Sequence, residues 1–166
     1  MYKSAINIVL FCPEIPNNTG NIVRSCTAFK ANLHLIKPYG FFLNDKRMVR
    51  AGLNCWDKVQ MFEHKSWEHF IETTPPNKAI WLLTKSGTTT PDQINMQTDN
   101  REQLYFVFGQ ETKGLPQTLM EQYSQNQVRI PIWNPVRSIN LSNTVACVLY
   151  EYAKQNHYFN LDKQCA

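Results

Sequence analysis

The sequence predicts one α/β domain with a mostly parallel sheet, and three observations support this fold class. Short apolar segments rich in β-branched or aromatic residues alternate with segments of helical periodicity. The 166 residues suffice for one domain with a sizeable core but are too few for two ordinary domains. With 43% hydrophobic and 18% charged residues, the composition is typical of a soluble globular chain and excludes disordered and membrane classes.

Each predicted strand is a short apolar run, and a candidate helix follows each one except the strand over residues 79–83, which is followed by a polar loop. The expected strands cover residues 6–11, 33–37, 79–83, 104–109 and 127–132. The expected helices cover residues 20–29, 46–51, 66–73, 115–122 and 142–155. Residues 86–100 are polar and rich in turn-forming residues, so we expect an exposed loop there. The domain is expected to span residues 1–156, with residues 157–166 as a C-terminal tail.

The last helix follows an unusually polar loop. An apolar stripe at the helical period runs from Leu141 to Tyr152, and Asn140 or Ser142 can cap its first turn. A single cap accounts for one polar residue, whereas this loop and the first turn carry several. They are Arg137, Ser138, Asn140, Ser142 and Asn143. Their number predicts a ligand site between the fifth strand and this helix.

Two other segments that follow strands have the same polar character. In residues 12–26, Asn21 and Arg24 lie three positions apart and project from the same side of a helix. Arg24 is either a surface cation or a ligand-facing residue, since open α/β sheets bind ligands beyond the carboxyl ends of their strands. In residues 108–116, the glycines resemble the start of a phosphate-binding loop, but the Lys and Ser/Thr that hold phosphate and magnesium are absent. We therefore expect recognition of a small molecule largely by main-chain groups.

Cysteines and charge limit the possible partners. The five cysteines form no C-x-x-C pair, which predicts reduced, mostly buried thiols in a cytoplasmic protein, without a zinc site or disulfides. They are Cys12, Cys26, Cys55, Cys147 and Cys165. No apolar run approaches the roughly 18 residues of a membrane span. The net charge of +4 permits a polyanionic partner without requiring one, and Lys46, Arg47 and Arg50 form either a phosphate-facing patch or ordinary surface.

Taken together, the segments NTGNIVR, FGQETKGLP and RIPIWNPVRSINLSNTVA resemble the three motifs of the SPOUT superfamily of AdoMet-dependent RNA methyltransferases. With PEIP before the first motif and DKRMVRAGL after the second strand, the chain is most similar to the short tRNA 2′-O-methyltransferases. These enzymes modify the wobble nucleotide, a cytidine or modified uridine at position 34. The resemblance extends from about Ile8 to Tyr152. It implies a deep C-terminal trefoil knot, a homodimer, tRNA as substrate and S-adenosyl-L-methionine (AdoMet) as cofactor, with no metal.

The resemblance also implies roles for particular residues. Those expected to hold AdoMet are Leu83, Gly109, Glu111, Gly114, Ile130, Ile132, Ser138, Asn140 and Leu141. Arg24 matches the motif arginine; because a guanidinium stays protonated, we expect it to orient the ribose hydroxyl and stabilise negative charge. An RNA phosphate is then a possible proton acceptor. Ser142 and Asn143 are expected to position the ribose, and Tyr150 is either catalytic or a core or interface aromatic.

The expected RNA contacts are Lys46, Arg47 and Arg50, with Arg137 nearer the cofactor. The chain departs from its relatives at Asn54 and Cys55, where Asp and Tyr are usual, and at Ile139, which replaces a methionine. The first departure bears on substrate choice. Two alternatives remain open: methylation of another tRNA or rRNA position, and a knotted RNA-binding protein without catalysis.

Overall fold

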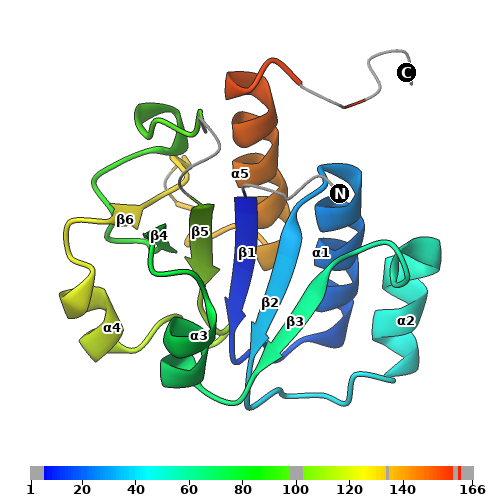
Figure 1. Cartoon of the computed structure of the whole chain (residues 1–166). Helices are drawn as coiled ribbons and strands as arrows, with labels where there is room; N and C mark the ends of the chain where they lie inside the picture. The colour runs from blue at the N-terminus through cyan, green and yellow to red at the C-terminus, as the bar shows by residue number, and fades with distance from the viewer. Residues whose placement is uncertain (1–5, 98–102, 134, 159–160, 162–166) are drawn as a thin grey trace.

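The computed structural model describes residues 6–97, 103–133, 135–158 and 161, and a parallel sheet lies at its centre (Figure 1). The strands are β1 (Ile6–Phe11), β2 (Asn32–Ile36), β3 (Met61–His64), β4 (Lys78–Leu83), β5 (Gln103–Phe108) and β6 (Gln127–Val128). Their order in the six-stranded sheet is β3-β2-β1-β5-β4-β6, and every pairing is parallel. The predicted α/β class with a parallel sheet is confirmed.

Helices cover both faces of this sheet. They are α1 (Pro16–Ala28), α2 (Lys46–Gly52), α3 (Trp67–Thr73), α4 (Gln117–Gln122) and α5 (Leu141–Gln155), with 3-10 turns η1 (Leu53–Cys55) and η2 (Pro91–Gln93). One core cluster joins the sheet to α1 and α5 through residues such as Ile22 and Val148. A second cluster on the opposite face includes Phe70 of α3 and Leu119 of α4 (Figure 1). The sheet is therefore the middle layer of three.

Helix α1 begins four residues before the predicted start at Gly20, so that prediction was wrong. Pro16 occupies the first helical turn, where the missing N–H costs no hydrogen bond. Gly20 then lies inside the helix because α2 packs directly against it: a Cβ there would clash with the Met48 carbonyl oxygen and lie 2.7 Å from the Cβ of Ala51. The glycine marks a close helix contact rather than a helix start.

The expectation of an exposed loop holds for only part of the segment from residue 86 to 97. The side chains of Ile94 and Met96 are 5% and 0% exposed, and both join the core. The Met96 N–H donates to Gln155 Oε1 at 2.9 Å, and its carbonyl accepts from Asn156 Nδ2 at 3.0 Å. This part of the predicted exposed loop is therefore attached to the end of α5. Strand β6 ends at Val128 instead of residue 132, and β3 was not predicted.

The thiols differ in their environment. Cys12 and Cys26 are buried, whereas Cys147 is exposed and Cys55 is intermediate, so the expectation of mostly buried thiols holds for only part of the set. Burial raises the pKa of the Cys26 thiol well above its usual range. Cys165 lies outside the described residues. Within those residues, no helix combines the length and apolar character that a membrane crossing requires.

A chain of buried polar side chains crosses the strands. His34 Nε2 lies 3.3 Å from Asn7 Oδ1, and His34 Nδ1 lies 2.9 Å from His64 Nε2. His64 Nδ1 is in turn 3.3 Å from Thr73 Oγ1. Burial, reinforced by the neighbouring His64, lowers the pKa of His34 to about 3. Burial also lowers the pKa of His64, with a further contribution from His69.

The lowered pKa values of His34 and His64 predict that the fold loses stability in acid. Because the folded chain holds His34 neutral while the unfolded chain binds a proton near pH 6.5, unfolding takes up protons below that pH. The free energy of unfolding should therefore be fully retained above about pH 6.5 and fall toward pH 3, by up to roughly 1.4 kcal/mol per pH unit for each histidine. Urea unfolding across this range measures it, and His34→Gln should flatten the profile. Equal pH profiles for the two proteins would contradict this assignment.

Candidate active site

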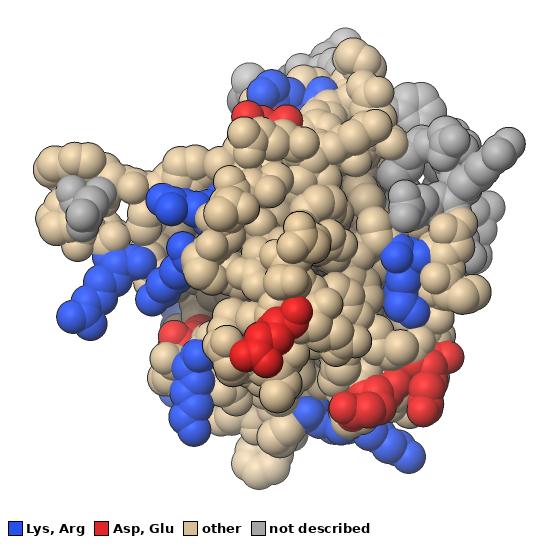
Figure 2. All heavy atoms as spheres, turned by 90° about the vertical axis from the view of Figure 1, so that its left-hand side faces the viewer, with Lys and Arg blue, Asp and Glu red and all other residues tan. Residues whose placement is uncertain are grey.

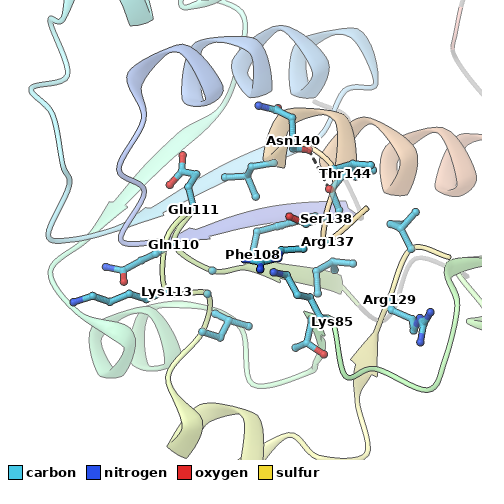
Figure 3. Close-up of a pocket in the computed structure, with 18 of the residues that line it drawn as sticks. Lys85, Phe108, Gln110, Glu111, Lys113, Arg129, Arg137, Ser138, Asn140 and Thr144 are labelled. Atoms are coloured by element: carbon cyan, nitrogen blue, oxygen red, sulfur yellow. Dashed lines mark hydrogen bonds between the residues drawn. The ribbon is translucent and has the colours of Figure 1, made fainter. Parts of the chain in front are cut away.

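A cavity with a volume of about 910 Å³ opens at the carboxyl edge of the sheet (Figure 3). Segments that follow β1, β4, β5 and β6 form its wall together with the first turn of α5. They converge because parallel strands bring their carboxyl ends to one edge. All nine residues expected to hold AdoMet line this cavity. They are Leu83, Gly109, Glu111, Gly114, Ile130, Ile132, Ser138, Asn140 and Leu141.

The segment after β5 forms a tight turn at the cavity wall. Gln110 and Gly114 exchange two backbone hydrogen bonds, of 3.0 and 2.9 Å. Gly114 has a φ of +71°, which side chains with a Cβ rarely adopt, although a Cβ there would meet no neighbour. Gly109 has the opposite constraint: a Cβ would lie 2.5 Å from Leu115 N and 2.7 Å from the Gly114 carbonyl oxygen. Glycine is therefore required at these positions for different reasons.

Two carboxylates join this turn to the segment after β1. Glu111 accepts hydrogen bonds from the backbone N–H groups of Glu14 and Ile15, at 2.9 and 3.2 Å. In return, Glu14 accepts from the backbone N–H of Thr112 at 2.9 Å and from its hydroxyl at 2.8 Å. These bonds from Thr112, and then the charge of Lys113, lower the pKa of the Glu14 carboxyl. The two loops are therefore braced in both directions.

The same network continues to α5. Asn18 donates from Nδ2 to Glu111 at 3.1 Å, while its Oδ1 accepts from Asn140 Nδ2 at 2.9 Å. Asn140 Oδ1 accepts from the backbone N–H of Ser142 at 2.8 Å and from its hydroxyl at 2.6 Å. Asn140 thus caps α5, which confirms one of the two predicted caps. Hydrogen bonds of Asn18 to Glu111 and to Asn140 therefore connect all three motif segments. Figure 3 shows Glu111 and Asn140 at the cavity wall.

The residues expected to act in catalysis are arranged differently. Of the described residues that line the cavity, none is Arg24, Ser142, Asn143 or Tyr150. Arg24 and Asn143 are exposed on α1 and α5, and Ser142 is buried beneath its cap. Tyr150 is 54% exposed, and its hydroxyl accepts from that of Tyr158 at 3.1 Å. A single chain therefore does not bring these four residues together with the cavity.

Positive charge surrounds the cavity more than the sequence suggested. Arg137, an expected RNA contact, lines it together with Lys85, Lys113 and Arg129, which were not predicted. Within the part of the chain that the structure describes, none of these four belongs to a salt bridge. Figure 2 shows several Lys and Arg side chains on the left of the face that it presents, with acidic side chains at its centre and lower right and also close to some of the cations. Lys85 lies two residues after the end of β4, a position that was the available signal. Arg129 directly follows β6, but it lies inside the strand that was predicted over residues 127–132.

The three cations expected on α2 are not equivalent. Lys46, Arg47 and Arg50 are all exposed, but Arg47 Nη2 lies 2.8 Å from Asp45 Oδ2 and its Nε donates to Oδ1 at 3.1 Å. These contacts lower the pKa of the Asp45 carboxyl to about 2. Arg47 is therefore partly neutralised, and Lys46 and Arg50 remain outside any salt bridge among the described residues.

The cavity suits a small molecule with both flat apolar and polar parts. Its volume lies within the range of roughly 300–1,000 Å³ that is usual for ligand sites. Apolar side chains such as Leu83, Phe108 and Ile130 share its wall with glycine-containing main chain and with Ser138. A flat adenine base matches the apolar part of this wall, and a ribose with a polar amino acid side arm matches the polar part. Among the described residues, no three His, Cys, Asp or Glu side chains are grouped as metal ligands would be.

Comparison with known proteins agrees with this architecture, an all-parallel α/β sheet with a cavity built from the loops at its carboxyl edge. The chain belongs to the SpoU rRNA Methylase family, whose model matches residues 5–150. A Mycoplasma genitalium relative, 80% identical over all of both chains, is provisionally named a tRNA (cytidine(34)-2′-O)-methyltransferase. The family resemblance inferred from the three motifs is confirmed.

Two solved structures share the fold. One, described in terms of 2-OH methylation of C/U34 on tRNA, has a TM-score of 0.84 and 34% identity, covering 92% of this chain and 97% of its own. The other is the SpoU methyltransferase AviRb from Streptomyces viridochromogenes in complex with the cofactor AdoMet. It has a TM-score of 0.78 and 20% identity, covering 95% of this chain and 60% of its own.

Proposed function

We propose that this protein transfers a methyl group from AdoMet to the ribose 2′-hydroxyl of nucleotide 34 in the tRNA anticodon loop. The observation that carries the proposal is the convergence of all three motif segments on one cavity. The names of the 80% identical relative and of the similar structure support the choice of reaction and nucleotide. Neither alternative, another RNA position or a non-catalytic protein, has a comparable observation in its favour.

AdoMet, when bound, supplies an electrophilic methyl group on a sulfonium. In this proposal the main chain near Gly109 and Ser138 holds the adenosyl part, and Leu83, Ile130 and Leu141 enclose its base. The other expected cofactor residues fix the shape of the cavity. Gly114 closes the turn after β5, and the hydrogen bonds of Glu111 and Asn140 hold the loops together. Ile132 extends the apolar wall.

We further propose that the active species is a homodimer. Arg24, Asn143 and Tyr150 are exposed on α1 and α5, which pack against each other, yet none lines the cavity of its own chain. A second copy with this helix layer against the cavity would supply them. Arg24 then orients the 2′-hydroxyl and stabilises the charge that develops on its oxygen, while Asn143 positions the ribose. Ser142, expected to share that role, is buried and bonded to Asn140, so it acts only by fixing the start of α5. The proton passes to an RNA phosphate, since a guanidinium does not accept it.

A trefoil knot is the second structural part of the proposal. The backbone of Val128 is enclosed by the segment after β4: its carbonyl accepts from Thr84 N, and the next N–H, of Arg129, donates to Thr89 O, both at 2.9 Å. On the same segment, a Cβ on Gly87 would lie 2.6 Å from the Val128 carbonyl carbon. This close wrapping supports passage of the following chain through the loop between β4 and β5.

The decisive experiment measures methyl transfer from labelled AdoMet to tRNA from a strain lacking the gene, in the presence of a chelator. Mapping of the modified ribose should place the label on nucleotide 34, and light scattering should give a dimer. Label found only outside the anticodon loop, or only on ribosomal RNA, would overturn the proposed substrate. Activity that requires an added divalent ion would contradict the metal-free site.

The α2 cations give a quantitative test of RNA binding. Reversing both Lys46 and Arg50 to glutamate should weaken tRNA binding by at least about tenfold and make its salt dependence less steep, because phosphate contacts release counterions. AdoMet affinity should not change, since neither residue lines the cavity. Filter binding over a salt series measures both effects. Arg47→Glu is the matched control and should have a smaller effect, because Asp45 already neutralises that guanidinium.

A further inference from the structure

One large aromatic side chain at the rim of the cavity has no part in the core. Trp133 is 83% exposed, and nearby Val136 is 51% exposed. Between β6 and α5 the chain forms neither helix nor strand in its described part, apart from a turn in which Val136 N donates to Trp133 O at 3.2 Å. Ile132 and Val136 both line the cavity. Trp133 is therefore held between two residues of the cavity wall and points its ring area largely into solvent.

The other three of the four tryptophans are used differently. Trp56 and Trp81 pack against one core cluster and Trp67 against the other. Burial of such a ring contributes strongly to folding stability, since a buried aromatic side chain removes roughly 150–250 Å² of surface from water. Trp133 contributes little of this folding stability, because most of its surface is exposed. Its exposed ring is available to a ligand that approaches the cavity from outside.

The charges around this ring indicate which ligand. Arg129 and Arg137 lie on the same segment as Trp133, and Lys85 and Lys113 complete a cationic rim around the cavity. Exposed aromatic rings among unpaired cations are how proteins bind single-stranded nucleic acid, because bases stack on the ring while the cations contact phosphates. A second copy of this chain would instead need acidic groups opposite the rim.

We propose that Trp133 stacks on an unpaired base of the anticodon loop next to the nucleotide whose ribose enters the cavity. Arg129 and Arg137 contact the phosphates on either side of that base. This inference rests on the proposed function and names the side chain that selects single-stranded over paired RNA. It assigns the residues between β6 and α5 a role in holding RNA in addition to enclosing the cofactor.

The test compares Trp133→Ala and Trp133→Phe with the unaltered protein. Trp133→Ala should bind an anticodon stem-loop about 5- to 150-fold more weakly, the range for loss of one base stack, and Trp133→Phe should recover much of this affinity. Binding to a fully paired RNA duplex should be equal in all three proteins. AdoMet affinity and the single-turnover rate at saturating tRNA should stay close to those of the unaltered protein. Phe62→Leu, which alters an exposed ring on β3 at the opposite edge of the sheet, is the matched control.

The outcomes separate the inference from the function on which it rests. If the unaltered protein does not methylate tRNA, the proposed function fails. If it does, and Trp133→Ala binds the stem-loop with unchanged affinity, only the stacking role fails. A dimer that dissociates in Trp133→Ala would show that the ring packs on a second copy. An equal loss of AdoMet and RNA affinity would make Trp133 part of the cofactor site, and either result would overturn the inference.

Discussion

Replacement of Arg24 by alanine is expected to lower the single-turnover rate of methyl transfer by about 100-fold or more. This is the scale observed when one preorganised group that stabilises developing charge is removed. AdoMet affinity and the thermal unfolding midpoint should be nearly unchanged, because Arg24 is exposed and does not line the cavity. Calorimetry and single-turnover kinetics measure the two properties separately. A rate close to that of the unaltered protein would exclude Arg24 from the reaction.

The position of Arg24 outside its own cavity leads to a sharper test. A heterodimer of one Arg24→Ala chain and one Gly109→Ala chain combines an intact cavity on the first with an intact arginine on the second. If Arg24 acts on the cavity of the other copy, this heterodimer regains one working site and about half the activity of the unaltered dimer. If Arg24 serves its own cavity, both sites remain inactive. The two parent homodimers are the controls.

Gly109→Ala is expected to have the largest effect on the cofactor site. The added Cβ would lie 2.5 Å from Leu115 N and 2.7 Å from the Gly114 carbonyl oxygen. Both are backbone atoms, so the turn itself must move. Overpacking of this kind costs roughly 1–3 kcal/mol, and at its upper end AdoMet affinity should fall about 100-fold. Calorimetric titration measures the loss, and circular dichroism checks that the fold persists.

Gly114→Ala is the matched control for this clash. Its Cβ would meet no neighbour, so the substitution is opposed only by a φ of +71°, at roughly 1–2 kcal/mol. That cost should appear as a lower unfolding midpoint, with AdoMet affinity reduced less than tenfold. Equal losses of affinity in the two variants would mean that the fit of Gly109 against the turn does not determine the shape of the cavity.

The sequence was informative where hydrophobic periodicity alone determines structure. Strand β1 was predicted with its observed limits because its residues are almost all buried. Strand β3 was missed because this four-residue edge strand carries Glu63 and an exposed Phe62, which a buried-strand pattern does not include. The buried Ile94 and Met96 were missed for a different reason: they lie in an otherwise polar segment, and the burial of Met96 depends on contacts with the end of α5.

The site was predicted to a similar extent. All nine residues that the resemblance assigned to AdoMet line the cavity, and their contact with AdoMet stays a prediction. The motifs did not reveal that Arg24 lies outside the cavity, because spacing along one helix contains no information about how that helix lies relative to the loops. The pairing of Glu14 with Thr112 joins residues 98 positions apart, and no local pattern predicts such a contact. Trp133 was overlooked because a tryptophan in an apolar stretch is usually a core residue.

The bracing carboxylate at the start of α1 has an electrostatic consequence. The free N–H groups at a helix start, with the positive end of the helix dipole, usually form a binding site for phosphate or carboxylate groups. Here Glu111 accepts from Glu14 N and Ile15 N, so an anion of the protein itself already occupies that position. An incoming polynucleotide is repelled there and attracted to the cationic side of the cavity. The charges around the site thereby favour RNA on its cationic side before any base is contacted.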